Sequence, residues 1–133
     1  MLCRFDLSRV RQASKCRGMP LLKIETTVGL TEDKQTALLN SLSKIVAGTI
    51  GKPEHYVMVT INSAAMLMCG KSGHTAFVDI RSIGGLSNEV NRKLSQQICK
   101  ILADSLGVAP DRVYLNFTDV DAGRWGWNGS TFG

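Results

Sequence analysis

The sequence predicts a single α/β domain made of two βαβ units, and three observations support this fold class. First, Gly29-Leu30-Thr31 recurs 56 positions later as Gly85-Leu86-Ser87. Second, in each copy a strand-like segment precedes an apolar series at helical spacing, and another strand-like segment follows it. Third, the 133 residues are 44% apolar and 20% charged, which suits one globular domain. Strand, helix and strand in so short a span predict a crossover between parallel strands.

The two expected helices are matched along the repeat. Thr31 and Ser87 are expected N-caps, because a hydroxyl accepts from the free N–H groups of a first helical turn. Gly51 and Gly107 are expected to end the helices in a left-handed conformation. The apolar positions between them predict one buried face. They are Leu38, Leu42, Ile45, Val46 and Ile50 in the first helix and Leu94, Ile98, Ile101, Leu102 and Leu106 in the second.

The expected strands flank these helices. Leu21–Thr27 and Thr75–Ser82 precede them, and Val57–Asn62 and Val113–Thr118 follow them. Two such units form a four-stranded mixed sheet, and right-handed crossovers place both helices on one face. The opposite face carries substantial side chains and open edges, so we expect self-association to cover it.

The net charge of +5 is concentrated at the start of the chain. Residues 1–19 carry five basic side chains and one acidic side chain, a net of +4. Residues 20–133 carry 11 basic and 10 acidic side chains, a net of +1. The body therefore has no electrostatic footprint for nucleic acid. No apolar run is long enough to cross a membrane.

The four cysteines, Cys3, Cys16, Cys69 and Cys99, predict neither a disulfide framework nor a metal site. None of them forms a CxxC pair, and His55 and His74 are not spaced as metal ligands. Cys99 falls on the apolar face of the second helix, where we expect a small core residue.

The pair Met19-Pro20 raises the question of where the working protein begins. Residues 1–19 are Arg-rich and lack the apolar core of a signal peptide. They suit a targeting segment, a wrongly chosen upstream start codon or a disordered tail. We favour a mature chain that begins at Pro20, with residues 20–133 as the domain. A terminal proline is a secondary amine that can take a proton, whereas a proline inside a chain is an amide.

Several motifs, in order, resemble one family. They are Pro20 after a methionine, Gly51-Lys52-Pro53, Ser82-Ile83-Gly84, Asp111-Arg112-Val113-Tyr114 and the tail Gly126-Trp127-Asn128-Gly129-Ser130-Thr131-Phe132. From residue 20 to residue 133 the chain resembles the macrophage migration inhibitory factor family of the tautomerase superfamily. The resemblance implies a homotrimer whose sheets surround a central channel. It also implies cofactor-free keto–enol tautomerase activity, of the phenylpyruvate tautomerase or L-dopachrome isomerase type.

Keto–enol exchange needs a base that moves a proton between a carbon and the neighbouring carbonyl oxygen, and such a base works best near its pKa. A terminal α-amino group has a pKa of about 7.7 to 8.0. Prolyl nitrogen is more basic, so apolar burial and a nearby lysine must lower its pKa. The family assigns these roles to Pro20 and Lys52, and Lys52 would also hold the substrate carboxylate. Without the family, Pro20 would be a strand-initiating proline and Lys52 a cation at a helix C-terminus.

The resemblance implies four more substrate-binding residues. The backbone N–H of Ile83 would hold the substrate carboxylate or oxygen, and Tyr56 would line the pocket. Tyr114 and Asn116 point to the same face of one strand because they are two residues apart. The family places both at an active site shared across the subunit boundary. Without the family, Ile83 would be a core residue and Tyr56 packing at a strand edge.

The aromatic tail carries Trp125, Trp127 and Phe132, and Asn128-Gly129 predicts a tight turn within it. A hairpin of this kind could dock on a neighbouring subunit, and its rings could also wall a pocket for a flat aromatic substrate. Trp125 replaces a smaller aliphatic residue of the mammalian members, which leaves the substrate preference open. Residues 74–78 lack the CxxC of those members, so a redox role lacks its reactive pair.

Three functions are therefore open. The first is the tautomerase. The second is a secreted or host-directed signalling protein, like the cytokines among the vertebrate relatives, with a receptor as partner and a vestigial pocket. The third is a chain that keeps residues 1–19 and is a catalytically dead binding module or an organelle-targeted precursor. We expect a cytoplasmic protein, or one exported without a signal peptide as is common in the family, and organelle targeting stays open.

Overall fold

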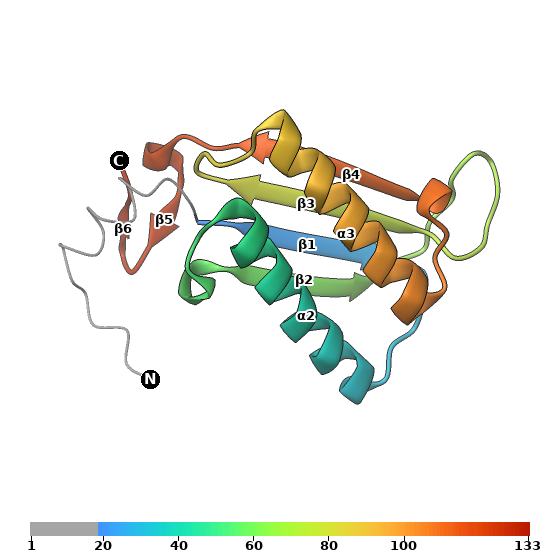
Figure 1. Ribbon diagram of the computed structural model, residues 1–133. Helices are drawn as coiled ribbons and strands as arrows, with labels where there is room; N and C mark the ends of the chain where they lie inside the picture. The colour runs from blue at the N-terminus through green and yellow to red at the C-terminus, as the bar shows by residue number, and fades with distance from the viewer. Residues whose placement is uncertain (1–18) are drawn as a thin grey trace.

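The chain forms one four-stranded mixed sheet with the strand order β2-β1-β3-β4 (Figure 1). The computed structural model describes residues 19–133, and residues 1–18 lie outside it. The strands are β1 (Leu21–Thr26), β2 (Met58–Ser63), β3 (Ala76–Ser82) and β4 (Val113–Asp119). β1 and β2 run parallel, as do β3 and β4, whereas β1 and β3 pair antiparallel. The two expected βαβ units are confirmed, and they join through their first strands.

Two helices of 19 residues each, α2 (Glu32–Ile50) and α3 (Asn88–Leu106), cover the same face of the sheet (Figure 1). Both expected N-caps are confirmed. The hydroxyl of Thr31 accepts from the backbone N–H three residues later at 3.3 Å, and the hydroxyl of Ser87 does the same at 3.2 Å. Each cap satisfies one of the N–H groups that a first helical turn leaves free.

Both expected helix ends are also confirmed. Gly51 and Gly107 adopt φ values of 78° and 67°, in the left-handed region that glycine enters without steric cost. After Gly51 the chain turns sharply, and Lys52 donates its N–H to the carbonyl of Ala47 at 2.9 Å. A short 3₁₀ turn, η1 (Glu54–Tyr56), then leads into β2.

The core lies between the sheet and the two helices. Its buried side chains come from both repeats, and eight of the ten helix positions expected on the buried face are among them, whereas Ile45 and Ile101 are only partly buried. The buried side chains are Leu22, Ile24, Leu38, Leu42, Val46, Ile50, Ala76, Val78, Ile80, Leu94, Ile98, Leu102, Leu106, Val108 and Val113. Cys99 packs against this core, and burial raises the pKa of its thiol, so its expected place is confirmed.

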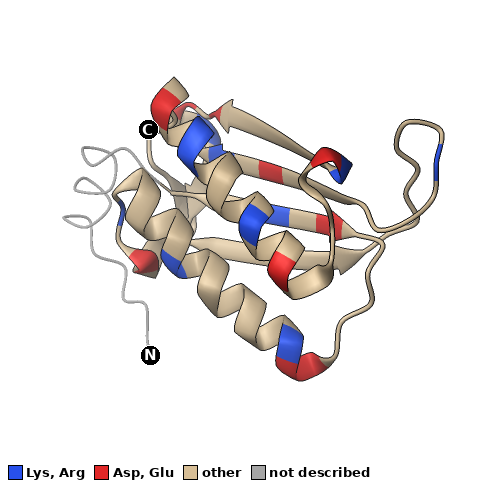
Figure 2. Ribbon diagram, turned by 45° about the vertical axis from the view of Figure 1, so that its right-hand side comes forward, with Lys and Arg blue, Asp and Glu red and all other residues tan. Residues whose placement is uncertain are grey.

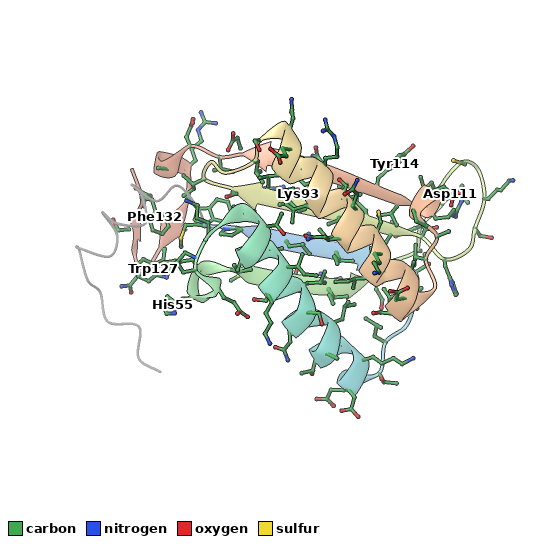
Figure 3. The ribbon with its side chains drawn as sticks, viewed as in Figure 1. His55, Lys93, Asp111, Tyr114, Trp127 and Phe132 are labelled. Atoms are coloured by element: carbon green, nitrogen blue, oxygen red, sulfur yellow. The ribbon has the colours of Figure 1, made fainter. Side chains whose placement is uncertain are left out.

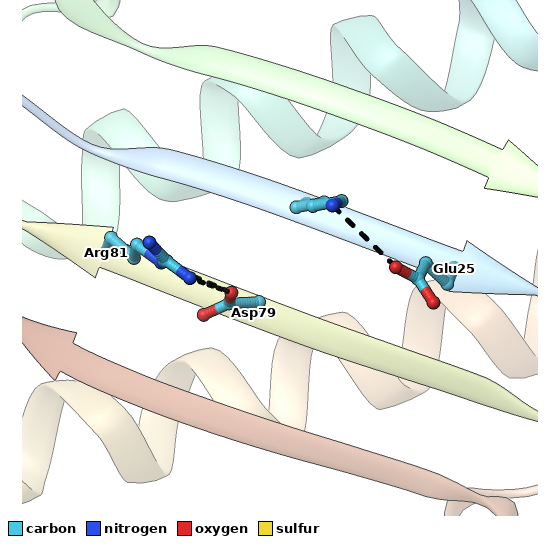
Figure 4. A network of polar contacts seen from close by, with 4 residues as sticks. Glu25, Asp79 and Arg81 are labelled. Atoms are coloured by element: carbon cyan, nitrogen blue, oxygen red, sulfur yellow. Dashed lines mark hydrogen bonds and ion pairs between the residues drawn. The ribbon is translucent and has the colours of Figure 1, made fainter.

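The face of the sheet away from the helices is more polar at its centre than the strand sequences suggest. Lys23 Nζ lies 3.7 Å from Glu25 Oε1 on β1, and the guanidinium of Arg81 donates to Asp79 Oδ2 on β3 at 3.1 Å (Figure 4). This face also exposes Met58 and Tyr114. The two ion pairs therefore make the centre of this face charged, and the large exposed side chains lie away from that centre.

Charged side chains of both signs are interspersed over the helices and loops (Figure 2). This mixture matches the near-neutral balance of residues 20–133. Among the described residues, no helix has the length and apolarity that crossing a membrane requires.

Candidate active site

The candidate site is at the end of the sheet where β1 begins and β3 ends. Leu21 pairs with Arg81, so the preceding residue, Pro20, lies next to the end of β3. The carbonyl of Pro20 accepts from the N–H of Met58 at 3.0 Å, which ties it to the start of β2 as well. The Pro20 side chain is fully buried. Strand pairing on both sides therefore fixes the position of this proline.

Aromatic rings gather at this end of the sheet, where Figure 3 shows Trp127 and Phe132, and Tyr56 and Trp125 pack in the same cluster. Trp127 stacks on Phe132 with their ring centroids 5.9 Å apart and an interplanar angle of 14°. Tyr56 meets Trp127 edge to face at 6.2 Å. Offset stacking and edge-to-face contacts are the arrangements that aromatic pairs favour. The rings form an apolar wall around Met19, the residue before Pro20, and Ile83 is buried in the same cluster.

A C-terminal hairpin supplies two of these rings. It consists of β5 (Gly126–Trp127) and β6 (Ser130–Thr131), joined by Asn128-Gly129 with φ values of 51° and 78°. Two positive φ values in a two-residue loop identify a type I′ turn, so the expected turn is confirmed. The N–H of Phe132 donates to the carbonyl of Trp125 at 3.2 Å, which folds the end of the chain back onto the cluster.

The loop after β3 holds Ile83 in place. The N–H of Gly84 donates to Asp119 Oδ1 at 2.9 Å, and the N–H of Val120 donates to the carbonyl of Ser82 at 2.9 Å. These two bonds tie the loop to the end of β4. The hydroxyl oxygen of Ser82 is buried and has no hydrogen-bond partner within residues 19–133. This unpartnered atom is at the same end of the sheet as Pro20, because Leu21 pairs with Arg81.

Lys52 lies on the turn between α2 and β2, four residues before Tyr56. Its side chain is half-buried, and its ammonium makes no ion pair with any described residue. The turn is short because the N–H of Tyr56 donates to the carbonyl of Pro53 at 3.1 Å. The same turn thus brings Lys52 and Tyr56 to the sheet end that carries Pro20.

Tyr114 and Asn116 do not join this site within one chain. Tyr114 pairs with Phe77, five residues before the end of β3, which places it about 16 Å along the strand from the Pro20 end. Figure 3 shows Tyr114 at the opposite end of the sheet from Trp127 and Phe132. Both residues are exposed, with Tyr114 at 66%. Within one chain, Tyr114 therefore lies away from Pro20, and Asn116 lies between them along β4.

Two members of the cluster were not expected from the sequence. Met19 is only 4% exposed and packs with Ile83 and Phe132, and Ala122 contributes from the loop after β4. From the sequence, Met19 is only the residue that precedes Pro20, and no packing role is predicted for it. No periodicity marks it, since it precedes the first strand and its contacts come from the far end of the chain.

Comparisons with known proteins agree with this arrangement. The family model described as macrophage migration inhibitory factor matches residues 19–133. A macrophage migration inhibitory factor homolog of Trichuris trichiura is 40% identical over 115 residues, which are 86% of this chain and all of that protein. The macrophage migration inhibitory factor of Meriones unguiculatus is 36% identical over 115 residues, covering 86% of this chain and 99% of that protein.

Solved structures of such proteins superimpose on the fold. A homologue from Prochlorococcus marinus has a TM-score of 0.81 at 38% identity and covers 85% of this chain and 99% of its own. A macrophage migration inhibitory factor-like protein from Entamoeba histolytica has a TM-score of 0.82 at 33% identity. The match covers 85% of this chain and 98% of that protein. The sequence, the fold and the aromatic cluster beside Pro20 agree: this chain belongs to the macrophage migration inhibitory factor family.

Proposed function

We propose that the chain, once Pro20 is its first residue, is a cofactor-free keto–enol tautomerase for aromatic 2-oxo acids such as phenylpyruvate. The observation that carries this proposal is the apolar aromatic wall of Tyr56, Trp127 and Phe132 around Met19, the residue next to a fully buried Pro20. A flat aromatic substrate suits such a wall because ring stacking favours offset planes. Tautomerase activity is typical of the family, which supports the proposal.

In the proposed reaction, the secondary amine of Pro20 removes a proton from the carbon beside the substrate carbonyl and returns a proton to the oxygen. The apolar surroundings of Pro20 disfavour its protonated form, which keeps the amine available as a base. The ammonium of Lys52, without an ion-pair partner among the described residues, holds the substrate carboxylate. The N–H of Ile83 donates to the carboxylate or carbonyl oxygen, and the loop bonds of Gly84 and Val120 fix its position.

The proposed working assembly is a homotrimer. Tyr114 lies about 16 Å and Asn116 about 10 Å along the strand from the Pro20 end of their own subunit, so we infer that they complete the site of a neighbour. A trimer would also cover the edges of the bare sheet face, where Met58 is 63% exposed. The central ion pairs of that face would then border a channel.

The test of the proposed base compares a chain that begins at Pro20 with its Pro20→Gly variant. We expect the substitution to lower kcat for phenylpyruvate at least about tenfold, because general bases contribute 10²–10⁴-fold. The keto–enol conversion is followed by ultraviolet absorbance. Circular dichroism and the oligomer mass should stay unchanged, which separates lost chemistry from lost folding. Unchanged turnover in a folded variant would rule out Pro20 as the base.

A signalling role is the second candidate, because the curated rodent relatives are named for inhibiting macrophage migration. In that case the pocket would be vestigial. A receptor-binding assay on the Pro20→Gly variant separates the two functions. Full receptor binding without turnover would favour signalling as the main role.

A further inference from the structure

Met19 lies inside the cluster that would receive the substrate. Its side chain is 4% exposed and packs with Ile83 and Phe132, which are equally buried. The half-buried rings of Tyr56, Trp125 and Trp127 surround the same group. The proposed function gives a substrate-binding role to four of these five partners, Tyr56, Ile83, Trp127 and Phe132. The methionine therefore occupies the space between the pocket walls.

A methionine suits this position chemically. Its side chain is unbranched and polarisable, fills irregular apolar space and makes favourable contacts with aromatic rings. A flat aromatic substrate would seek the same contacts with the same rings. Met19 is also held in place by the chain, because Pro20 is anchored through its carbonyl to Met58 N–H at 3.0 Å. A tethered group competes at a high effective concentration, of the order of millimolar.

We propose that Met19, while joined to Pro20, acts as an intramolecular plug of the substrate pocket. The uncleaved chain is then inhibited in two ways: the Met19 side chain occupies the pocket, and the Pro20 nitrogen is an amide and not an amine. This inference rests on the proposed function for the identity of the pocket. The plug leaves by hydrolysis of the Met19–Pro20 bond. One water is consumed, the C–N bond breaks, Met19 departs with a new carboxylate, and the Pro20 nitrogen becomes a secondary amine.

The plug predicts that binding and catalysis can be separated. The Met19→Ala substitution shortens the side chain but leaves the Pro20 nitrogen acylated. Met19→Leu keeps the volume and therefore serves as the matched control at the same position. Phenylpyruvate is the probe, and its affinity for the full chain of 133 residues is measured by isothermal titration calorimetry. A chain that begins at Pro20 is the reference for an open pocket.

We expect the full chain with Met19→Ala to bind phenylpyruvate about tenfold or more tightly than the unsubstituted full chain, yet to show no tautomerase activity. Apparent affinity falls in proportion to the fraction of open pockets, so a plug that leaves about a tenth of the pockets open weakens binding about tenfold. The Met19→Leu chain should bind as weakly as the unsubstituted chain. Thermal melts and oligomer mass confirm folding, and Met19→Val replaces Met19→Ala if the latter does not fold.

The outcomes distinguish the plug from the proposed function. Equal affinity of the full chain before and after Met19→Ala would overturn the plug, as would tight binding by Met19→Leu. A chain from Pro20 that binds no phenylpyruvate would overturn it too, because a pocket without Met19 must be open. If the chain from Pro20 binds the probe without turning it over, and Met19→Ala still gains affinity, the proposed function fails and the plug stands.

Discussion

At the scale of single residues, the nitrogen of Pro20 depends on one covalent bond for its chemistry. As an amide within the chain it carries no usable basicity, and as a terminal amine it can accept a proton. The same bond carries Met19 into the aromatic cluster. Breaking it would therefore supply the proposed base and open the proposed pocket together, with no rearrangement of the strands that position Pro20.

The two described cysteines should differ in reactivity. Cys69 is exposed in the loop before β3, whereas Cys99 packs against the core and burial raises the pKa of its thiol. A higher pKa means less thiolate at a given pH, and the thiolate is the nucleophile. We expect iodoacetamide at a pH of about 8 to alkylate Cys69 about tenfold faster or more than Cys99.

Peptide mass mapping over time measures both rates in one sample. Denaturing urea provides the control, because it removes the burial of Cys99 and should bring the two rates together. Equal rates in the folded protein would contradict burial as the cause of the difference.

At the scale of the elements, the N-caps decide where the helices begin. The hydroxyl of Ser87 accepts a hydrogen bond from Val90 N–H at 3.2 Å, and α3 starts at the next residue. We expect Ser87→Ala to lower the free energy of unfolding by about 1 kcal/mol, because it leaves that N–H without its partner. Urea denaturation at a fixed protein concentration measures the change.

Ser87→Asp is the matched control, because a carboxylate caps a helix and also favours its positive N-terminal end. It should retain the unsubstituted stability within a few tenths of a kcal/mol. A loss as large as that of Ser87→Ala would show that the side chain acts through some contact other than the cap.

The C-terminal hairpin shows how a local turn can build a distant site. Asn128-Gly129 reverses the chain through two positive φ values, and the backbone bond from Phe132 to Trp125 closes the structure at 3.2 Å. Trp127 and Phe132 then stack next to Tyr56, which is about 70 residues away in sequence. The turn is local, but its effect on the pocket is long-range.

At the scale of the whole molecule, one subunit holds only part of the proposed site. Pro20 is at one end of the sheet, Tyr114 is on β4 near the other end, and Asn116 is in the middle of β4. The site would thus exist only in the assembled oligomer. Two inactive variants that damage different halves of the site should therefore restore activity when they are mixed.

Pro20→Gly and Asn116→Ala, both in chains that begin at residue 20, provide this test. After the two proteins are unfolded together and refolded in equal amounts, three quarters of random trimers are mixed, and each mixed trimer has one intact site. We expect about a quarter of the wild-type activity. Each variant refolded alone is the control. No recovery from a mixture that forms trimers would contradict a site shared between Pro20 and Asn116 of neighbouring subunits.

The sequence by itself determined the two βαβ units. Caps at Thr31 and Ser87, left-handed glycines at the helix ends and apolar positions at helical spacing are local signals, and each acts through hydrogen bonds or sterics within one turn of the chain. Strand boundaries differed by about one residue. Val57, expected in the second strand, instead closes the 3₁₀ turn by donating its N–H to Glu54 at 3.0 Å.

Only the tertiary structure decided which distant residues meet. It joined the two units through antiparallel β1 and β3, put ion pairs at the centre of the bare face, and brought Met19 into contact with Phe132 across more than a hundred residues. It also separated Tyr114 from Pro20 along the strands. The physical reason is that periodicity and capping depend on neighbours in sequence, whereas such contacts depend on how the whole chain buries its surface, which no short segment encodes.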